Sequence, residues 1–150
     1  MKTTLNKIRA HAPCADGWKK LLKHLGKTEA DDEPLNIKTI IESNGVDDAL
    51  WCLQAVEGKD KEIRLFAVWC ARQVQHLMAD QRSLDALDVA ERFANGLASE
   101  EELNDAAKPA WDAAEAANAA ARDAAWAARD AAGVAAKEAQ AKKLIEICED

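Results

Sequence analysis

The amino-acid sequence predicts an all-α protein: a single-domain bundle of about six to seven helices that ends in one long, alanine-rich helix. Apolar residues recur at helical spacing along most of the chain, and glycines and prolines fall between these segments. From Ala106 to Ala141, 20 of 36 residues are alanine, the residue with the highest helix propensity. The chain has 150 residues, 49% of them apolar, which is enough for one hydrophobic core.

Residues 1–58 are expected to form a segment of short helices. Pro13 separates helices over 4–11 and 16–25, because proline fixes its own φ and has no N–H to donate. A further short helix is expected before Asn44-Gly45, a pair typical of a helix C-terminus. Asp47 or Asp48 is then a candidate N-cap for the helix that follows.

Residues 59–150 are expected to form the helical core. The segment 60–79 is apolar on most sides, with Val74 and Leu77 in its main stripe, and such a helix is typically central. Ser83 is a candidate N-cap for the next helix, which is expected over 84–95.

The last helix follows a strong start signal. Ser99 and Glu102 have the spacing of a capping box, and Pro109 either starts the last helix or kinks it. One continuous helix is expected over Ala106–Ala141. One of its sides is a stripe of small residues suited to close helix packing, at positions 113, 117, 120, 124, 127, 131 and 134.

The net charge of −7 is unevenly distributed along the chain. Residues 1–27 carry seven basic side chains and one acidic one, which leaves a net charge of −13 for residues 28–150. A lysine-rich end can bind phosphate, but it is more often a solvated helix face, so nucleic acid is not the favoured partner. The acidic remainder favours a larger, basic protein partner.

Two tryptophans, Trp111 and Trp126, fall on the charged side of the last helix, near Arg122 and Arg129. One interpretation is structural: the helix packs on both sides, the indoles fill gaps, and the arginines stack on Trp126. The other is functional: the tryptophans are exposed anchors rimmed by charge, a composition that interface hot spots favour. The sequence leaves both open.

No catalytic constellation stands out, so a non-enzyme without a cofactor or metal is expected. Cys70 and His76 are six positions apart, which does not suit one metal ion on one helix. Lys27 and Thr28 follow Gly26 as in a phosphate-binding loop, but the earlier glycine and the leading strand are absent. The cysteines are expected to be free thiols, and the absence of a long apolar run predicts a cytoplasmic protein that does not enter membranes.

Three stretches of the second segment resemble immunity proteins of bacterial toxin–immunity systems: IRLFAVWCARQVQHL, RSLDALDVAERFANGLASEEEL and WDAAEAANAAARDAAWAARDAA, which begin at Ile63, Arg82 and Trp111. CADGWKKLLKHLGKT and NGVDDALWCL, within residues 1–58, resemble a segment carried on phage and prophage proteins. The resemblance implies a helical inhibitor that binds a toxin directly and blocks its site. An anti-defence protein of a phage, such as an anti-CRISPR inhibitor, is the alternative that the same resemblance implies.

The partner-binding residues predicted from the sequence lie on the last helix and at the preceding start signal: Trp111, Arg122, Trp126, Arg129, Glu100, Glu101 and Glu102. A third function class remains, a structural or assembly protein that forms a homodimer through the stripe of small residues. An unrecognised enzyme would need a bound metal or small molecule, or a functional cysteine or histidine.

Overall fold

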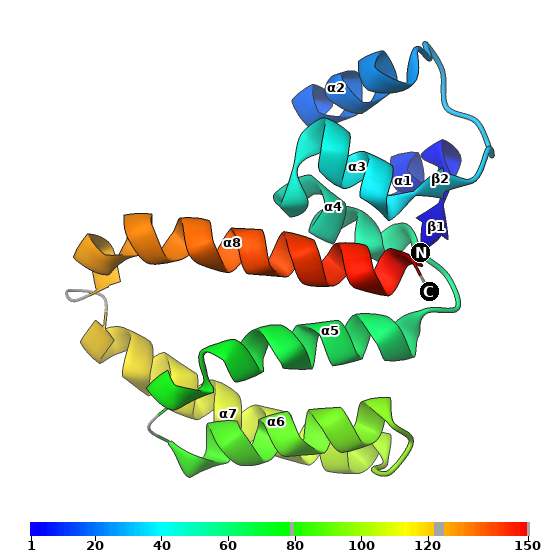
Figure 1. Cartoon of the computed structure of the whole chain (residues 1–150). Helices are drawn as coiled ribbons and strands as arrows, with labels where there is room; N and C mark the ends of the chain where they lie inside the picture. The colour runs from blue at the N-terminus through cyan, green and yellow to red at the C-terminus, as the bar shows by residue number, and fades with distance from the viewer. Residues whose placement is uncertain (79, 122–124, 150) are drawn as a thin grey trace. The chain divides into compact units, whose positions relative to one another are not determined.

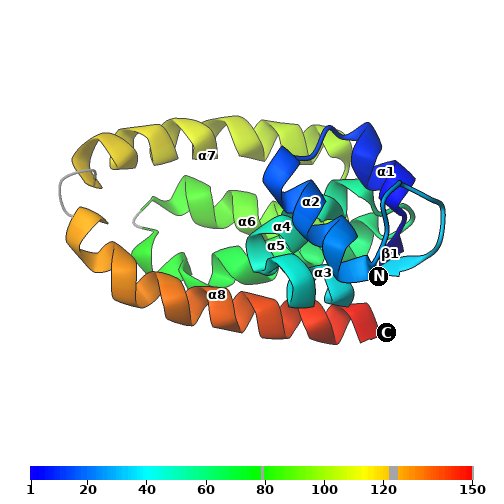
Figure 2. The ribbon, with the colours of Figure 1, turned by 90° about the horizontal axis from the view of Figure 1, so that it is seen from above.

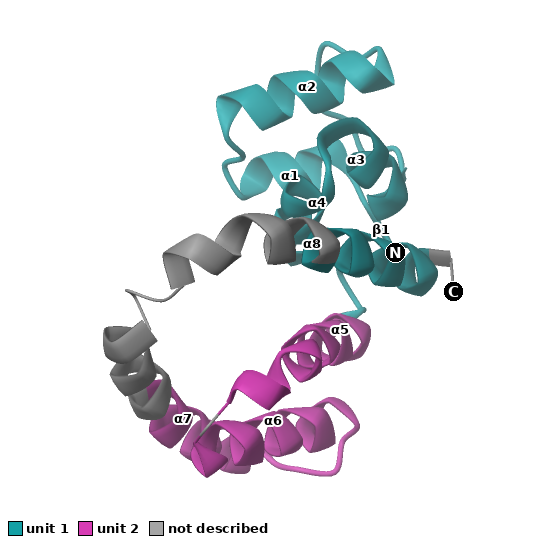
Figure 3. Ribbon diagram, turned by 60° about the vertical axis from the view of Figure 1, so that its left-hand side comes forward, with its two compact units in different colours: residues 1–59, 136–150 teal, residues 60–135 magenta. Residues whose placement is uncertain are grey.

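The computed structural model describes residues 1–78, 80–121 and 125–149, with side chains except those at 112–135 and 149. The described residues form eight α-helices, two short 3-10 helices and one sheet of two strands (Figure 1). The predicted all-α class is confirmed. The chain divides into two compact units, unit 1 with residues 1–59 and 136–150, and unit 2 with residues 60–135 (Figure 3).

Unit 1 combines short helices with a strand pair. Its elements are β1 (Lys2–Thr3), α1 (Leu5–Ala10), α2 (Ala15–Leu25), β2 (Leu35–Asn36), α3 (Ile37–Asn44), α4 (Val46–Cys52), the 3-10 helix η1 (Leu53–Ala55) and the C-terminal part of α8 (Ala125–Glu149). The strands are antiparallel, with Lys2 opposite Asn36 and Thr3 opposite Leu35. These strands were not expected from the sequence, because a two-residue strand is too short to show alternation.

Local rules account for the helix ends in unit 1. Thr4 caps α1, its hydroxyl accepting a hydrogen bond from the Lys7 amide at 3.2 Å. Gly26, with a φ of +65°, ends α2. Gly45, with a φ of +101°, both ends α3 and precedes α4. The prediction that Asp47 or Asp48 caps α4 is wrong: both lie in its first turn, and Gly45 holds the N-cap position.

The core of unit 1 contains the largest fully buried side chains among those described: Leu5, Ile8, Ile37, Ile40 and Leu144. The C-terminal part of α8 contributes Leu144 to this core and also makes polar contacts with the unit. Lys137 Nζ lies 2.7 Å from Asp47 Oδ2, and the Met1 ammonium donates to the Cys148 carbonyl at 3.1 Å. Residues that the sequence analysis placed with the second segment therefore belong to the first unit.

Figure 2 gives a second view of α2 and α3, which pack against each other in unit 1. Leu21 of α2 is buried, while Trp18, Leu22 and Leu25 on the same stripe are half-buried. The apolar face predicted for this helix is therefore its packing face.

Unit 2 is built from helices that pack in sequence order. Its elements are α5 (Asp60–Gln73), the 3-10 helix η2 (Gln75–Leu77), α6 (Gln81–Ala94), α7 (Glu100–Ala121) and the N-terminal part of α8. α6 packs against both α5 and α7. Arg72 of α5 links the first pair, because its Nη2 lies 2.6 Å from Asp88 and 2.8 Å from Glu91, both on α6. The guanidinium of Arg64 lies 4.9 Å from the ring centroid of Phe93.

Two sequence-based expectations for unit 2 need correction. α5 ends at Gln73, and Val74 and Leu77 beyond it are exposed, so the segment is not a central helix with one continuous stripe. The N-cap of α6 is Asp80, whose carboxylate accepts from the Arg82 amide, and Ser83 lies inside the helix.

The single helix expected over 106–141 is described as parts of α7 and α8, and residues 122–124 between them lie outside the described residues. Pro109 lies within α7.

Candidate functional site

The candidate site is the exposed side of α7. It carries those predicted partner-binding residues whose side chains the structure describes. Glu100, Asn104 and Trp111 follow one another at i, i+4 and i+11, so they lie on one face of the helix and span about 16 Å along it. We define the α7 face as six exposed residues on this side of the helix: Glu100, Glu101, Asn104, Asp105, Lys108 and Trp111. Leu103 and Ala106, which are half-buried, mark the opposite side.

Trp111 is 74% exposed, the largest exposed fraction among the large apolar side chains that the structure describes. The interpretation that it fills a packing gap is therefore wrong for this residue. An indole in this position leaves a large apolar surface in water. Exposure of this kind is a common property of side chains that anchor a protein interface.

The three glutamates at the start of α7 have different environments. Glu102 completes the predicted capping box: its carboxylate accepts from the Ser99 amide at 2.8 Å, and its own amide donates to the Ser99 hydroxyl at 3.1 Å. It also lies 3.2 Å from Arg92. These contacts lower the pKa of Glu102, the bond from the Ser99 amide most of all. Glu102 is thus a structural residue of the helix start.

Glu100 and Glu101 are exposed, and neither forms an ion pair within the part of the chain that the structure describes. Negative charges in the first helical turn are also favourable for the helix, because the N-terminus carries a partial positive charge. Both carboxylates remain accessible to a cationic partner.

The remaining predicted site residues lie outside the described side chains. Arg122 is outside the described residues altogether, and for Trp126 and Arg129 the backbone of α8 is described but the side chains are not. The stripe of small residues, from position 113 to position 134, also lies outside the described side chains.

The net negative charge of the chain is concentrated in unit 2, because that unit has fewer basic residues. Its sequence has 14 acidic and 8 basic residues, whereas that of unit 1 has 13 acidic and 12 basic residues. Several basic groups of unit 2 contact groups within the unit: Arg72 and Arg92 pair with carboxylates, and Arg64 lies on Phe93. The charge excess on its surface is therefore negative.

Exposed leucines near the helix ends of unit 2 were missed by the sequence analysis as surface features. Leu97, in the turn before α7, is 68% exposed, and Leu77, in η2, is 72% exposed. Leu97 comes directly after Gly96 and belongs to no apolar stripe of a helix. This position in the sequence could have identified it as a surface residue.

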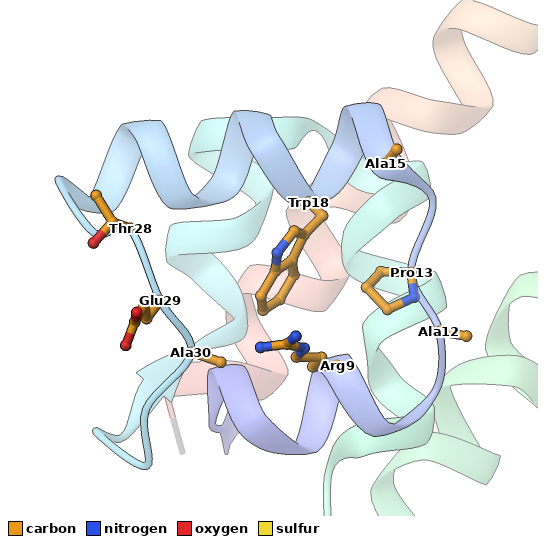
Figure 4. A pocket seen from close by; sticks show the side chains of 8 residues that line it. All are labelled: Arg9, Ala12, Pro13, Ala15, Trp18, Thr28, Glu29 and Ala30. Atoms are coloured by element: carbon orange, nitrogen blue, oxygen red, sulfur yellow. The ribbon is translucent and has the colours of Figure 1, made fainter.

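Unit 1 contains an open cavity of about 730 Å³ beside the turn between α1 and α2. Figure 4 shows Trp18 extending from α2 toward Arg9 of α1. Thr28 and Glu29 lie at one end of the cavity and Pro13 at the other. Within the described structure, the side chain of Arg9 forms no hydrogen bond and no ion pair. The cavity is lined by one cation and one anion, Arg9 and Glu29, and this pair gives no preference for the charge of a ligand.

The cysteines do not form a disulfide or a metal site in the described structure. Cys14 is exposed, Cys70 is half-buried, and Cys52 and Cys148 are buried. No group of three His, Cys, Asp or Glu residues among those described is placed to hold a metal ion. None of the described helices is both long enough and apolar enough to cross a membrane.

The chain was also compared with known proteins. It matches no protein-family model, no curated protein and no solved structure. The resemblance to immunity proteins therefore stays a prediction that depends on the residues quoted above.

Proposed function

We propose that the chain is a non-catalytic inhibitor that binds a larger, basic protein through the α7 face and blocks that protein's functional site. The observation that carries this proposal is the 74% exposure of Trp111 on the same helix face as Glu100, in the more acidic of the two units. An exposed indole beside carboxylates offers both an apolar anchor and a charge for recognition.

The two components of the α7 face have different physical roles. Burial of the Trp111 indole supplies binding energy, because a large apolar surface leaves water. Glu100 and Glu101 accelerate the encounter with a basic surface and select among partners, and they contribute less to the final affinity. We expect the association to weaken as salt concentration rises.

The resemblance to immunity proteins supports an inhibitory role and a partner that is a bacterial toxin. The resemblance of residues within 1–58 to phage proteins supports the alternative, an anti-defence inhibitor whose partner is a host effector such as a CRISPR nuclease. Both kinds of partner bind or cleave nucleic acid in many systems, so a basic surface is expected on either. The identity of the captured partner distinguishes the two roles.

The first experiment is affinity capture of the tagged full chain from a bacterial lysate at low and high salt, with bound proteins identified by mass spectrometry. The purified partner is then titrated with the wild-type chain and with Trp111→Ala and Glu100→Lys/Glu101→Lys variants. We expect Trp111→Ala to weaken Kd by about 30-fold, the effect of losing roughly 2 kcal/mol at a hot spot. The double charge reversal should lower the association rate and its salt dependence.

Two matched controls separate the α7 face from general effects. Leu77→Ala removes an exposed apolar side chain of unit 2 outside α7. Glu29→Lys/Glu42→Lys makes the same change in net charge at exposed positions of unit 1. Both should bind within about three-fold of wild type. Equal weakening by the controls, capture of the chain by itself alone, or a partner whose activity the chain leaves unchanged would contradict the proposal.

A further inference from the structure

A second cavity of unit 1 lies between α2 and α4 and shares Pro13 and Trp18 with the open cavity. We call it the α2–α4 groove. Its volume is about 220 Å³, below the range of about 300 to 1,000 Å³ that is typical of drug-sized ligands. The groove therefore has room for a ligand with one ring system.

The walls of the groove are mainly apolar. Ile8, Leu21 and Ile40 line it and are buried core residues, so they form a fixed surface. Trp18 and Trp51 also line it, and Trp51 remains 39% exposed. Indole faces and aliphatic side chains together are the environment that a planar apolar group prefers.

One edge of the groove is polar and carries a negative charge. Asp48 Oδ2 accepts a hydrogen bond from Asn44 Nδ2 at 2.7 Å, and the same amide group donates to the Gly17 carbonyl at 2.8 Å. Asp47 also lines the groove, but its charge is balanced by Lys137. Asp48 forms no ion pair within the described structure, so its carboxylate gives the groove a net negative charge.

Cys52 shows that the charge of Asp48 acts inside the groove. Burial, and after it the nearby carboxylate of Asp48, raise the pKa of the Cys52 thiol to about 12. The thiol is therefore neutral at physiological pH and belongs to the apolar wall. A cation placed in the groove would be favoured by the same carboxylate.

We infer that the α2–α4 groove binds a ligand with one planar apolar ring system and a cationic amine, the ring between Trp18 and Trp51 and the amine toward Asp48. The size of the groove selects a single ring system, and its charge selects the amine. Such a group occurs in free aromatic amines and in protein segments where an aromatic residue is next to lysine. The inference does not depend on the proposed function, because the groove lies in unit 1 and the α7 face in unit 2.

The test uses tryptamine as the probe, titrated into the isotope-labelled full chain and followed by amide and indole N–H chemical shifts. We expect a Kd on the order of 1 mM, as is typical of so small a ligand, with shifts at Gly17, Trp18 and Trp51. Indole-3-propionate has the same ring with an anionic end and should bind several-fold more weakly. The peptide acetyl-Lys-Trp-Lys-amide is titrated in the same way. Tighter binding of the peptide than of tryptamine would indicate a protein segment as the natural ligand, and tighter binding of tryptamine would indicate a free amine.

Variants locate the two parts of the site. Asp48→Asn removes the charge but keeps the shape, and should weaken tryptamine binding by roughly three- to five-fold while leaving indole-3-propionate no weaker. Trp51→Ala should weaken both probes. Glu42→Gln, an exposed charge on α3 outside the groove, and Trp111→Ala in unit 2 are the controls and should leave both unchanged.

Two results would overturn the inference: tryptamine binding no tighter than indole-3-propionate, or shifts outside the groove. The two proposals are tested by separate measurements. Binding of the partner by the α7 face tests the proposed function, and binding of tryptamine in the groove tests this inference, so either can fail while the other holds.

Discussion

Unit 1 and unit 2 differ in where they place their large apolar side chains. The largest fully buried side chains that the structure describes, such as Ile37 and Leu144, all belong to unit 1. Of the large apolar side chains that are exposed among the described residues, Trp51 lies in unit 1, whereas Val74, Leu77, Leu97 and Trp111 lie in unit 2.

The two units also differ in charge, because the excess of acidic residues is concentrated in unit 2. Large apolar and acidic side chains that lie in water contribute little to the stability of the fold, but they are available to contact a partner. The comparison indicates that unit 1 supplies most of the described core and unit 2 most of the surface suited to binding.

The largest expected effect comes from removing a core side chain of unit 1. Leu144→Ala should lower the free energy of unfolding by about 2 to 5 kcal/mol, because it leaves a cavity at a fully buried position. Leu77→Ala in unit 2 should change it by no more than about 0.5 kcal/mol, since this side chain is already in water. Urea unfolding followed by circular dichroism measures both. Similar losses for the two variants would remove the distinction between the units.

A smaller effect is expected at the start of α7, where unit 2 depends on local hydrogen bonds. Ser99→Ala removes the hydroxyl that accepts from the Glu102 amide and should cost about 1 kcal/mol. Hydrogen exchange should accelerate at the first amides of α7 and not in unit 1. Ser83→Ala is the matched control, because Ser83 is not the N-cap of α6, and it should be nearly neutral. Equal costs for the two serines would argue against the capping box.

The smallest effect concerns the dependence of unit 2 on pH. The side-chain hydrogen bond from Arg82, and then the bond from its amide, lower the pKa of Asp80 from 3.8 to about 2. Because the folded pKa lies below the unfolded one, the stabilisation is complete above pH 3.8 and is lost as pH falls toward 2.

We therefore expect Asp80→Asn to be less stable than wild type at pH 5, with a difference that disappears near pH 2. Asparagine can still cap the helix, so the variant isolates the charge. Acid unfolding curves of both proteins, with Asp85→Asn as control, test this. A difference that stays constant with pH would show that the charge of Asp80 does not matter.

The sequence predicted those helix ends that depend on a few neighbouring residues. The pair Asn44-Gly45 ends a helix, and Ser99 and Glu102 form a capping box, as their local patterns indicate. Asp47 failed as an N-cap, because α3 and α4 are joined through Gly45 alone and leave no room for a separate capping residue.

Features that depend on residues far apart in the sequence were not predictable in this way. The pairing of Lys2 with Asn36 has no local signal, and the α2–α4 groove forms only when Trp18 and Trp51 line one cavity. For the candidate site, the sequence identified Trp111 and the glutamates but could not decide whether the indole was packed or exposed, because exposure depends on which neighbours cover it.

The contribution of Leu144 to the core of unit 1 also affects how the protein is made. During synthesis at about 5 to 20 residues per second, the ribosome needs roughly 4 to 17 seconds to proceed from Lys59 to Leu144. Throughout this interval, residues 1–59 lack the last helix of their own unit. The nascent chain therefore carries an incomplete hydrophobic core while unit 2 is being translated, and it completes unit 1 only as the C-terminal helix emerges.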